Sequence, residues 1–327
     1  MQKILRIQGP FNLERGGVLP FVDISYFMSE PENTEKPFVW VCHALTGNAD
    51  VFNWWPDFFN PNSPFSAHKF NIICANILGS CYGTTGPLSL DAEGKKWYSR
   101  FPEFTIRDIV FFHELLRKEL LINRINWLIG PSLGGQQALE WSYLLGDKLD
   151  NLLLIATNAF HSAWGIAWNE SQRWAIEADP TWLEDHDQAG LEGMKIARSM
   201  ALLSYRSVFA YNKNLNTYST NSKSYQRYQG EKLALRFNAI SYYRLTQAMD
   251  SHHFLENKSH GFLGIKAKTY IIGISTDLLF PLRDAEFLHE NIPSSIFLKI
   301  ESEFGHDAFL IDARKIIEVM KPYLLTN

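Results

Sequence analysis

The stretch 128–141, LIGPSLGGQQALEW, passes from an apolar run into a helix-like sequence through the short segment GPSLG at 130–134. A serine with glycine two positions before it and two positions after it matches G-x-S-x-G, the turn at which a buried strand ends and a helix begins. The glycines keep side chains out of this tight turn and leave the serine hydroxyl exposed. The same letters also arise in ordinary turns and helix caps, but a strand before and a helix after favour Ser132 as a nucleophile.

Short apolar runs rich in aromatic and β-branched residues alternate with segments that carry apolar residues at helical spacing. The first kind is typical of buried strands and the second of amphipathic helices. This alternation predicts an α/β fold with a mostly parallel central sheet flanked by helices on both faces. We expect strands at 37–45, 69–77, 125–130, 149–157, 266–274 and 294–300, helices at 105–121, 133–145, 282–291 and 308–323, and an antiparallel edge strand at 21–30.

The alternation stops between residues 160 and 262, where the chain becomes polar and rich in Trp, Tyr and Arg. Helical pieces occur there without strands, among them GMKIARSMALLSYRSVFAY at 193–211. We therefore predict a helical lid, 160–262, inserted into a core domain made of 1–159 and 263–327. Within the lid, the polar stretch 212–224 indicates a flexible loop.

The composition excludes several classes of function. A formal net charge of -4 without a dense Lys/Arg run gives no basic surface for nucleic acid. The three cysteines lack the paired spacings of a zinc site and are too few for a disulfide framework, so we expect reduced thiols and no metal. No apolar run approaches the roughly 20 residues of a membrane span, and no signal peptide is evident, which favours a cytoplasmic protein away from membranes.

A nucleophilic serine needs a base and an orienting acid, which follow in the order Ser, Asp or Glu, His in this kind of fold. His306 lies on a short glycine-containing loop between the last predicted strand and the last helix. Asp277 comes just after a buried strand, at the edge where the sites of parallel sheets gather. Glu301 and Glu303 are alternative acids on the His306 loop. We predict a Ser132-Asp277-His306 triad in which Asp277 orients His306 and His306 takes the Ser132 proton.

The oxyanion formed during acyl transfer needs backbone N–H donors. One is expected from Leu133, directly after the nucleophile, and the other from Leu45 in the segment CHALTGNA that follows an early strand. His43 in the same segment precedes the turn, a place that favours a structural hydrogen-bonding role over that of a base.

Several longer blocks carry a resemblance to a known family. In order and spacing, from about residue 38 to 312, the chain resembles the homoserine O-acetyltransferase family. Several of the blocks, notably those with GSCYGTTGP and YQGEKLALRFNAISYYRLTQAMD, have no role in a generic hydrolase signature, which makes the resemblance specific. The blocks are VCHALTGNADVFNWW, NIICANILGSCYGTTGPLSLD, FPEFTIRDIV, GPSLGGQQALEW, QRWAIEADPTW, YQRYQGEKLALRFNAISYYRLTQAMD, STDLLFP and GHDAFL.

The resemblance implies an α/β-hydrolase fold with a helical lid, and transfer of acetyl from acetyl-CoA to the side-chain hydroxyl of L-homoserine through acetyl-Ser132, a step of methionine biosynthesis. It also implies substrate-binding roles for Arg198, Tyr205 and Asp307. An arginine suits the carboxylate of an amino acid, and an aspartate next to the base suits its ammonium group. Acetyl-CoA would be a substrate and no cofactor is implied. The family further suggests a homodimer formed through the lid.

Other functions fit the same sequence features. A serine esterase or peptidase of the same fold has the same triad, because the first acyl transfer to Ser132 is the same. A non-catalytic binding module is a further class, which the intact Ser, Asp, His order disfavours. Within the transferase hypothesis, succinyl-CoA is the alternative donor and L-serine the alternative acceptor, since pockets discriminate small apolar differences only weakly.

Overall fold

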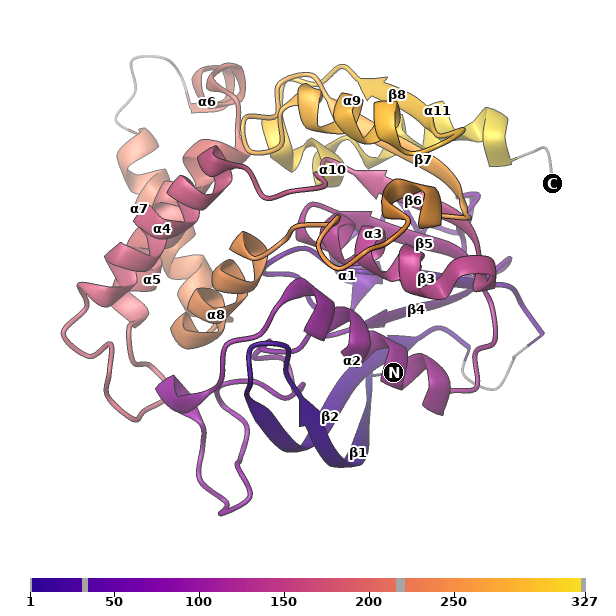
Figure 1. Cartoon of the computed structure of the whole chain (residues 1–327). Coiled ribbons are helices and arrows are strands. Elements are labelled where there is room, and N and C mark those ends of the chain that lie inside the picture. The colour runs from indigo at the N-terminus through magenta and orange to yellow at the C-terminus, as the bar shows by residue number, and fades with distance from the viewer. Residues whose placement is uncertain (1, 31–34, 216–220, 325–327) are drawn as a thin grey trace.

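The computed structural model describes residues 2–30, 35–215 and 221–324, in which a single sheet of eight strands runs through the core domain (Figure 1). The strand order is β1-β2-β4-β3-β5-β6-β7-β8. Pairs from β4 to β8 are parallel, whereas β1 and β2 pair antiparallel with each other and β2 pairs antiparallel with β4. The strands are β1 (Gln2–Asn12), β2 (Val18–Met28), β3 (Phe38–Val41), β4 (Asn71–Ala75), β5 (Ile125–Pro131), β6 (Leu149–Ile155), β7 (Lys268–Ile274) and β8 (Ile296–Ile300).

The predicted mostly parallel sheet is confirmed, and its central strands β3 and β4 are buried along their whole length. The expected antiparallel strand at 21–30 is present as β2, but it is not an edge strand, because it lies between β1 and β4. The outer strand is β1, at Gln2–Asn12. The sequence pattern missed it because most of its side chains are exposed, so it lacks the buried apolar face by which strands are recognised.

Helices cover both faces of the sheet, as Figure 1 shows. Apolar side chains of α2 (Ile106–Glu119), α3 (Leu133–Leu145) and α9 (Leu282–Asn291) pack in one buried cluster on one face. Those of α1 (Val51–Trp54) and α11 (Ala313–Leu324) pack in a second cluster on the other face. The layered arrangement buries the apolar strands from both sides, as parallel sheets require.

Between β6 and β7 the chain forms helices that gather beside the sheet at the left of Figure 1. Helix α5 packs against both α4 and α7, and α8 packs against α4. These helices fall within the predicted lid range 160–262, and the described part of that range contains no strand. They are α4 (Ala163–Glu177), α5 (Leu191–Tyr205), α6 (Val208–Leu215), α7 (Asn221–Ala234) and α8 (Ala239–Asp250).

Three predictions made from the sequence need correction. The expected helix 193–211 is broken after Tyr205, and a new helix starts at Val208. The predicted helix 308–323 is divided at Asp312 into α10 (Ala308–Ile311) and α11. The stretch 212–224 was expected to be a loop, but both of its ends are helical, in α6 and α7, while 216–220 lies outside the described residues. The polar composition of 212–224 did not predict these helical ends, because a surface helix needs only a narrow apolar face.

A buried ion pair joins α3 to the segment that follows α8. The Lys258 ammonium lies 2.6 Å from Glu140 Oε2, and both side chains are almost fully buried. Glu140 Oε1 faces His252 Nδ1 at 3.8 Å, while the other ring nitrogen of His252 contacts the Asn158 carbonyl at 3.2 Å. Burial raises the pKa of the Glu140 carboxyl from 4.5 to about 7, in spite of the neighbouring ammonium.

The raised pKa of Glu140 predicts a pH-dependent stability. The folded protein holds a proton that the unfolded chain releases, so this contribution is fully present below pH 4.5 and is lost as the pH rises through about 7. A Glu140→Gln variant keeps a neutral side chain at every pH. Between pH 5 and 8 the free energy of unfolding of the wild type should therefore fall further than that of the variant, by on the order of 3 kcal/mol. Urea denaturation at the two pH values measures this difference. Glu119→Gln, which changes an exposed carboxylate of α2, is the control, and equal pH dependence in all three proteins would contradict the prediction.

Candidate active site

Ser132 lies at the turn between β5 and α3 in a backbone conformation that side chains rarely adopt, with φ 58° and ψ -127°. Its N–H donates to the Ile155 carbonyl at 2.9 Å, which ties the turn to the end of β6. Both flanking glycines are required by close backbone contacts. A Cβ at Gly130 would lie 2.1 Å from the Gly134 oxygen, and one at Gly134 would lie 2.0 Å from the Cys42 oxygen. The turn therefore has the strained geometry expected of a nucleophile elbow.

The structure brings Ser132, His306 and Asp277 into a hydrogen-bonded chain. The Ser132 hydroxyl lies 2.8 Å from His306 Nε2, and His306 Nδ1 lies 2.6 Å from Asp277 Oδ2. The other carboxylate oxygen, Oδ1, accepts the backbone N–H groups of Leu279 and Phe280, each at 2.9 Å. Asp277 is thus fixed by its own turn, and it presents one oxygen to the histidine. With Nδ1 donating to Asp277, the Nε2 lone pair faces the serine, as a general base requires.

Aromatic rings enclose His306. The ring of Phe280 stacks on it with a centroid distance of 5.2 Å, and the rings of Phe309 and Tyr205 lie at 5.3 and 5.7 Å. Two of these rings come from the core, whereas Tyr205 comes from the lid helix α5. The histidine therefore lies between the core and the lid and is only 3 % exposed.

The two alternative acids have other partners. Glu301 pairs with Lys299 at 2.6 Å, and Glu303 pairs with Lys213 at 2.6 Å. Only Asp277, among the three acids considered from the sequence, has a hydrogen bond to the histidine. Asp277 follows β7, Ser132 follows β5 and His306 follows β8. The three groups therefore lie together at the carboxyl ends of parallel strands.

The two predicted oxyanion donors lie on either side of the elbow. Leu133 begins α3, and Leu45 lies on the segment after β3, in which the Cys42 carbonyl lies against the elbow glycine Gly134. Neither N–H donates to an acceptor among the described residues. The Leu133 N–H lies in the first turn of α3, where N–H groups lack partners within the helix and the helix dipole adds positive charge, whereas Leu45 lies in a turn outside any helix. These two positions are able to receive a developing negative charge.

His43 has the structural role that its place in the sequence indicated. Its Nδ1 lies 2.9 Å from the Ala44 carbonyl and its Nε2 lies 3.3 Å from the Ile77 N–H. The Nδ1–H donates and Nε2 accepts, so the ring is neutral, and burial lowers its pKa to about 4. His43 shapes the loop that carries Leu45 and is not available as a base.

Arg236 was not identified from the sequence, yet it holds the loop that carries Leu45. Its guanidinium donates to the Thr46 carbonyl at 2.7 Å, to the Thr46 hydroxyl at 3.3 Å and to the Tyr82 hydroxyl at 2.7 Å. The ring of Tyr82 contacts that of Phe237. The two sequence blocks without a role in a generic hydrolase, GSCYGTTGP and YQGEKLALRFNAISYYRLTQAMD, thus meet each other beside the elbow. The presence of both blocks in the sequence pointed to this region. A sequence alone does not show that the two blocks are in contact.

The three substrate-binding candidates lie around His306. The Arg198 guanidinium lies 5.4 Å from the centre of the Tyr205 ring, which in turn contacts His306. Arg198 and Tyr205 are two helical turns apart and share one face of α5. Arg198 is half-buried and forms no ion pair with any residue that the structure describes. Asp307 follows the histidine and accepts a hydrogen bond from Arg206 at 2.9 Å.

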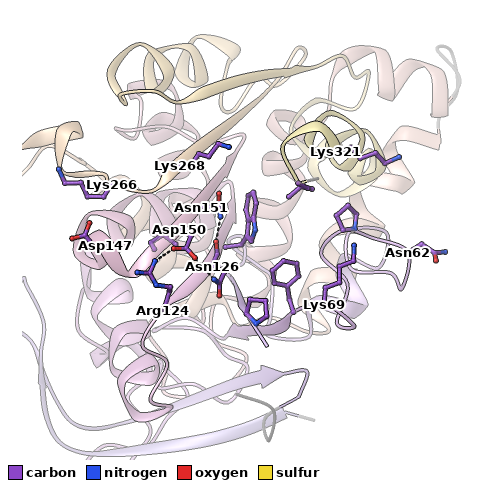
Figure 2. Close-up of a pocket in the computed structure, with 16 residues that line it drawn as sticks. Asn62, Lys69, Arg124, Asn126, Asp147, Asp150, Asn151, Lys266, Lys268 and Lys321 are labelled. Carbon is purple, nitrogen blue, oxygen red and sulfur yellow. Dashed lines mark hydrogen bonds and ion pairs between the residues drawn. The ribbon is translucent and has the colours of Figure 1, made fainter. Parts of the chain in front are cut away.

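A cleft of about 1150 Å³ opens at the opposite edge of the sheet, near the amino ends of β5, β6 and β7 (Figure 2). Arg124 and Asn126 both point at Asp150 and donate hydrogen bonds to its carboxylate. The lysines of the rim, among them Lys266 and Lys321, lie apart and do not converge on one point. Since every member of the triad follows the carboxyl end of a strand, this cleft is separate from the candidate active site in spite of its size.

The described residues contain no group of three or more His, Cys, Asp or Glu side chains placed to hold a metal ion. Cys42, Cys74 and Cys81 are free thiols. In the same part of the chain, none of the helices has both the length and the apolar character needed to cross a membrane.

Comparison with known proteins gives consistent results. A family defined by the alpha/beta hydrolase fold matches residues 37–313. Homoserine O-acetyltransferase of Cyclobacterium marinum is 40% identical over 100% of this chain and 96% of its own. The chain belongs to the homoserine O-acetyltransferase family. It is accordingly an enzyme with the α/β-hydrolase fold.

Solved structures show how widely this fold is shared. The crystal structure of homoserine O-acetyltransferase from Staphylococcus aureus superposes with a TM-score of 0.86 at 27% identity, covering 100% of this chain and 96% of that chain. An esterase superposes with a TM-score of 0.90 at 20% identity, covering 99% of both chains. The second likeness concerns the fold alone, so the fold by itself does not separate a transferase from an esterase.

The contacts of Arg236 predict an effect on acylation of Ser132. Arg236→Gln should lower kcat/KM for p-nitrophenyl acetate about tenfold, because the loop that carries the Leu45 N–H loses its anchor in the lid. Stopped-flow release of p-nitrophenol measures the acylation step. Arg227→Gln removes an exposed arginine of α7 that has no partner among the described residues, and it should react as the wild type does. An unchanged rate in Arg236→Gln would show that this anchor does not matter for acylation.

Proposed function

We propose that the protein transfers acetyl from acetyl-CoA to the side-chain hydroxyl of L-homoserine, through an acetyl-Ser132 intermediate. The product, O-acetyl-L-homoserine, would serve methionine biosynthesis. The names of the relatives support the reaction, and the arrangement of the triad supports the covalent route. The proposed substrates place the reaction in the cytoplasm, which cell fractionation would test.

In the first half-reaction the Ser132 oxygen attacks the thioester carbonyl of acetyl-CoA while His306 Nε2 takes the serine proton. The N–H groups of Leu45 and Leu133 stabilise the oxyanion. The C–S bond then breaks, and His306 returns the proton to the thiolate, so that free CoA leaves and acetyl-Ser132 remains. Asp277, hydrogen-bonded to Nδ1, stabilises the imidazolium formed in between.

In the second half-reaction the side-chain hydroxyl of L-homoserine gives its proton to His306 and attacks the acetyl ester. Breakdown of the tetrahedral intermediate returns the proton from His306 to Ser132 and releases the O-acetyl product. The acceptor must be held in line, because water competes for the same ester. Arg198 would bind the α-carboxylate, Asp307 the ammonium group, and Tyr205 would line the space between them.

One observation carries the choice of an amino-acid acceptor. The half-buried Arg198 contacts the Tyr205 ring, which contacts His306, and it has no ion-pair partner among the described residues. The half-buried Asp307 directly follows His306 in the chain. A zwitterionic acceptor supplies a carboxylate for Arg198 and an ammonium group for Asp307 beside its existing partner Arg206, and a simple ester or water supplies neither.

Incubation with acetyl-CoA alone provides the first test. Mass spectrometry should detect one acetyl group on the peptide that contains Ser132, with release of one equivalent of CoA, since the intermediate is covalent. L-homoserine should then accelerate CoA release well above the rate in water and yield O-acetyl-L-homoserine. Ser132→Ala should show neither acetylation nor CoA release.

The same assay separates the alternatives. Simple esters turned over quickly, with no acceleration by L-homoserine, would identify a serine hydrolase and refute the transferase. Faster reaction with succinyl-CoA than with acetyl-CoA would reassign the donor, and faster reaction with L-serine would reassign the acceptor.

We further propose a homodimer formed through the lid. Large apolar side chains of α4, α5 and α6 are exposed, as expected of a surface that another subunit covers. Analytical ultracentrifugation should give twice the mass of the chain, and Phe209→Glu should shift the protein toward the monomer. A monomeric wild type would contradict the proposal. The exposed side chains include Trp174, Ile196, Leu203, Val208 and Phe209.

A further inference from the structure

The chain turns sharply between α5 and α6, where the sequence indicated one continuous helix. Helix α5 ends at Tyr205, and Arg206 is extended with φ -118° and ψ 142°. The Ser207 hydroxyl then accepts the Ala210 N–H at 3.1 Å, in the manner of a helix N-cap, at the start of α6. Arg206 therefore leaves the helical path directly after the tyrosine that contacts His306.

This turn of the lid fits tightly against the core loop that precedes His306. The Ser207 hydroxyl donates to the Glu303 carbonyl. Gly305 has φ +66°, and a Cβ there would lie 2.7 Å from the Ser207 nitrogen and 2.9 Å from the Tyr205 oxygen. Only glycine fits this position, because both its conformation and its neighbours exclude a side chain. Lid and core are in direct contact within two residues of the catalytic base.

Arg206 holds Asp307 across the same contact. Its Nε donates to Asp307 Oδ2 at 2.9 Å, and the guanidinium lies 5.2 Å from the centre of the Tyr225 ring. The two side chains are 28% and 16% exposed. Half-buried ion pairs are less screened than surface pairs, and the aromatic ring restricts the guanidinium further. Asp307 Oδ1 accepts no hydrogen bond from the residues that the structure describes.

We propose that Arg206 is a positioning residue for the acceptor: it fixes Asp307, the residue after His306, through Oδ2 and so leaves Oδ1 to receive the ammonium group of the amino acid. This inference rests on the proposed function. A carboxylate already fixed before the acceptor arrives loses little freedom on binding, and it holds the attacking hydroxyl in line with acetyl-Ser132. The ion pair thereby favours the amino acid over water as the acceptor.

The Arg206–Asp307 ion pair should raise the fraction of acetyl-Ser132 that reacts with the acceptor instead of with water. Without the guanidinium, the Asp307 carboxylate rotates freely and binds the ammonium less well. Arg206→Gln should raise KM for L-homoserine about tenfold and lower the ratio of transfer to hydrolysis by a similar factor. Formation of acetyl-Ser132 needs no acceptor, so the loss should be confined to the second half-reaction. A merely structural role would slow both half-reactions together.

The experiment measures, for each variant, single-turnover CoA release from acetyl-CoA, KM and kcat for L-homoserine, and the ratio of O-acetyl-L-homoserine to acetate. Arg206→Lys, which keeps the charge, should restore part of the ratio. Arg314→Gln is the matched control, because Arg314 forms an ion pair of the same length, 2.9 Å, with Asp57 on the surface. This control should leave all four quantities unchanged.

A double variant shows whether Arg206 acts through Asp307. Asp307→Asn alone and Arg206→Gln with Asp307→Asn should give the same product ratio, since the arginine has nothing left to position. Additive losses would overturn the inference, as would an Arg206→Gln protein with wild-type KM and product ratio, or one in which Ser132 acetylation slows equally. If the wild type failed to transfer acetyl to L-homoserine, the proposed function itself would fall, and this inference with it.

Discussion

The backbone of Ser132 is the constraint on which the rest of the site depends. A residue with a side chain is held at φ 58° because the strand, the turn and the helix leave it no other conformation. Gly130 and Gly134 make this possible, since a Cβ at either position would overlap a backbone atom. The serine oxygen and the first N–H of α3 are therefore fixed by main chain rather than by flexible side chains. Such fixed geometry is what an acyl-transfer site needs before the substrate arrives.

The parallel sheet supplies the remaining catalytic groups from one edge. Ser132, Asp277 and His306 are far apart in sequence, but each follows the carboxyl end of a strand, so a single sheet aligns all three. The two turns of Asp277 and His306 are then held by their own backbone contacts: Asp277 accepts two N–H groups, and the Thr276 hydroxyl accepts the Gly305 N–H at 3.0 Å. The core domain alone thus defines a serine nucleophile with its base, which is common to hydrolases and transferases.

The lid places charged and aromatic side chains next to the triad. It contributes Arg198, which has no ion-pair partner in the part of the chain that the structure describes, the ring of Tyr205 against the base, and the Arg206 that holds Asp307. It also reaches the other side of the elbow, where Arg236 fixes the loop of Leu45. The cationic groups around His306 therefore come from the insertion, whereas the carboxylates of Asp277 and Asp307 come from the core. In the function we propose, the core makes the acyl-enzyme and the lid decides which hydroxyl receives the acyl group.

Local patterns in the sequence were enough to determine the central fold and the triad candidates. A buried strand, a G-x-S-x-G turn and an amphipathic helix are each encoded over a few residues, and the order Ser132, Asp277, His306 follows from the alternation of strands and helices. The same patterns missed β1, whose side chains are mostly exposed, and treated helical residues on both sides of 216–220 as a loop. In these segments the apolar signal is weak, so packing decides their structure.

Only the tertiary structure decided how the lid meets the core. The sequence 193–211 is helical throughout by propensity, yet the chain breaks at Arg206 because the contacts with Glu303 and Gly305 and the ion pair with Asp307 are satisfied only there. These contacts join residues about a hundred positions apart, and no local pattern encodes them. The sequence by itself determined that Ser132 has a base and an acid, while the three-dimensional packing of the lid determined which charges surround that base.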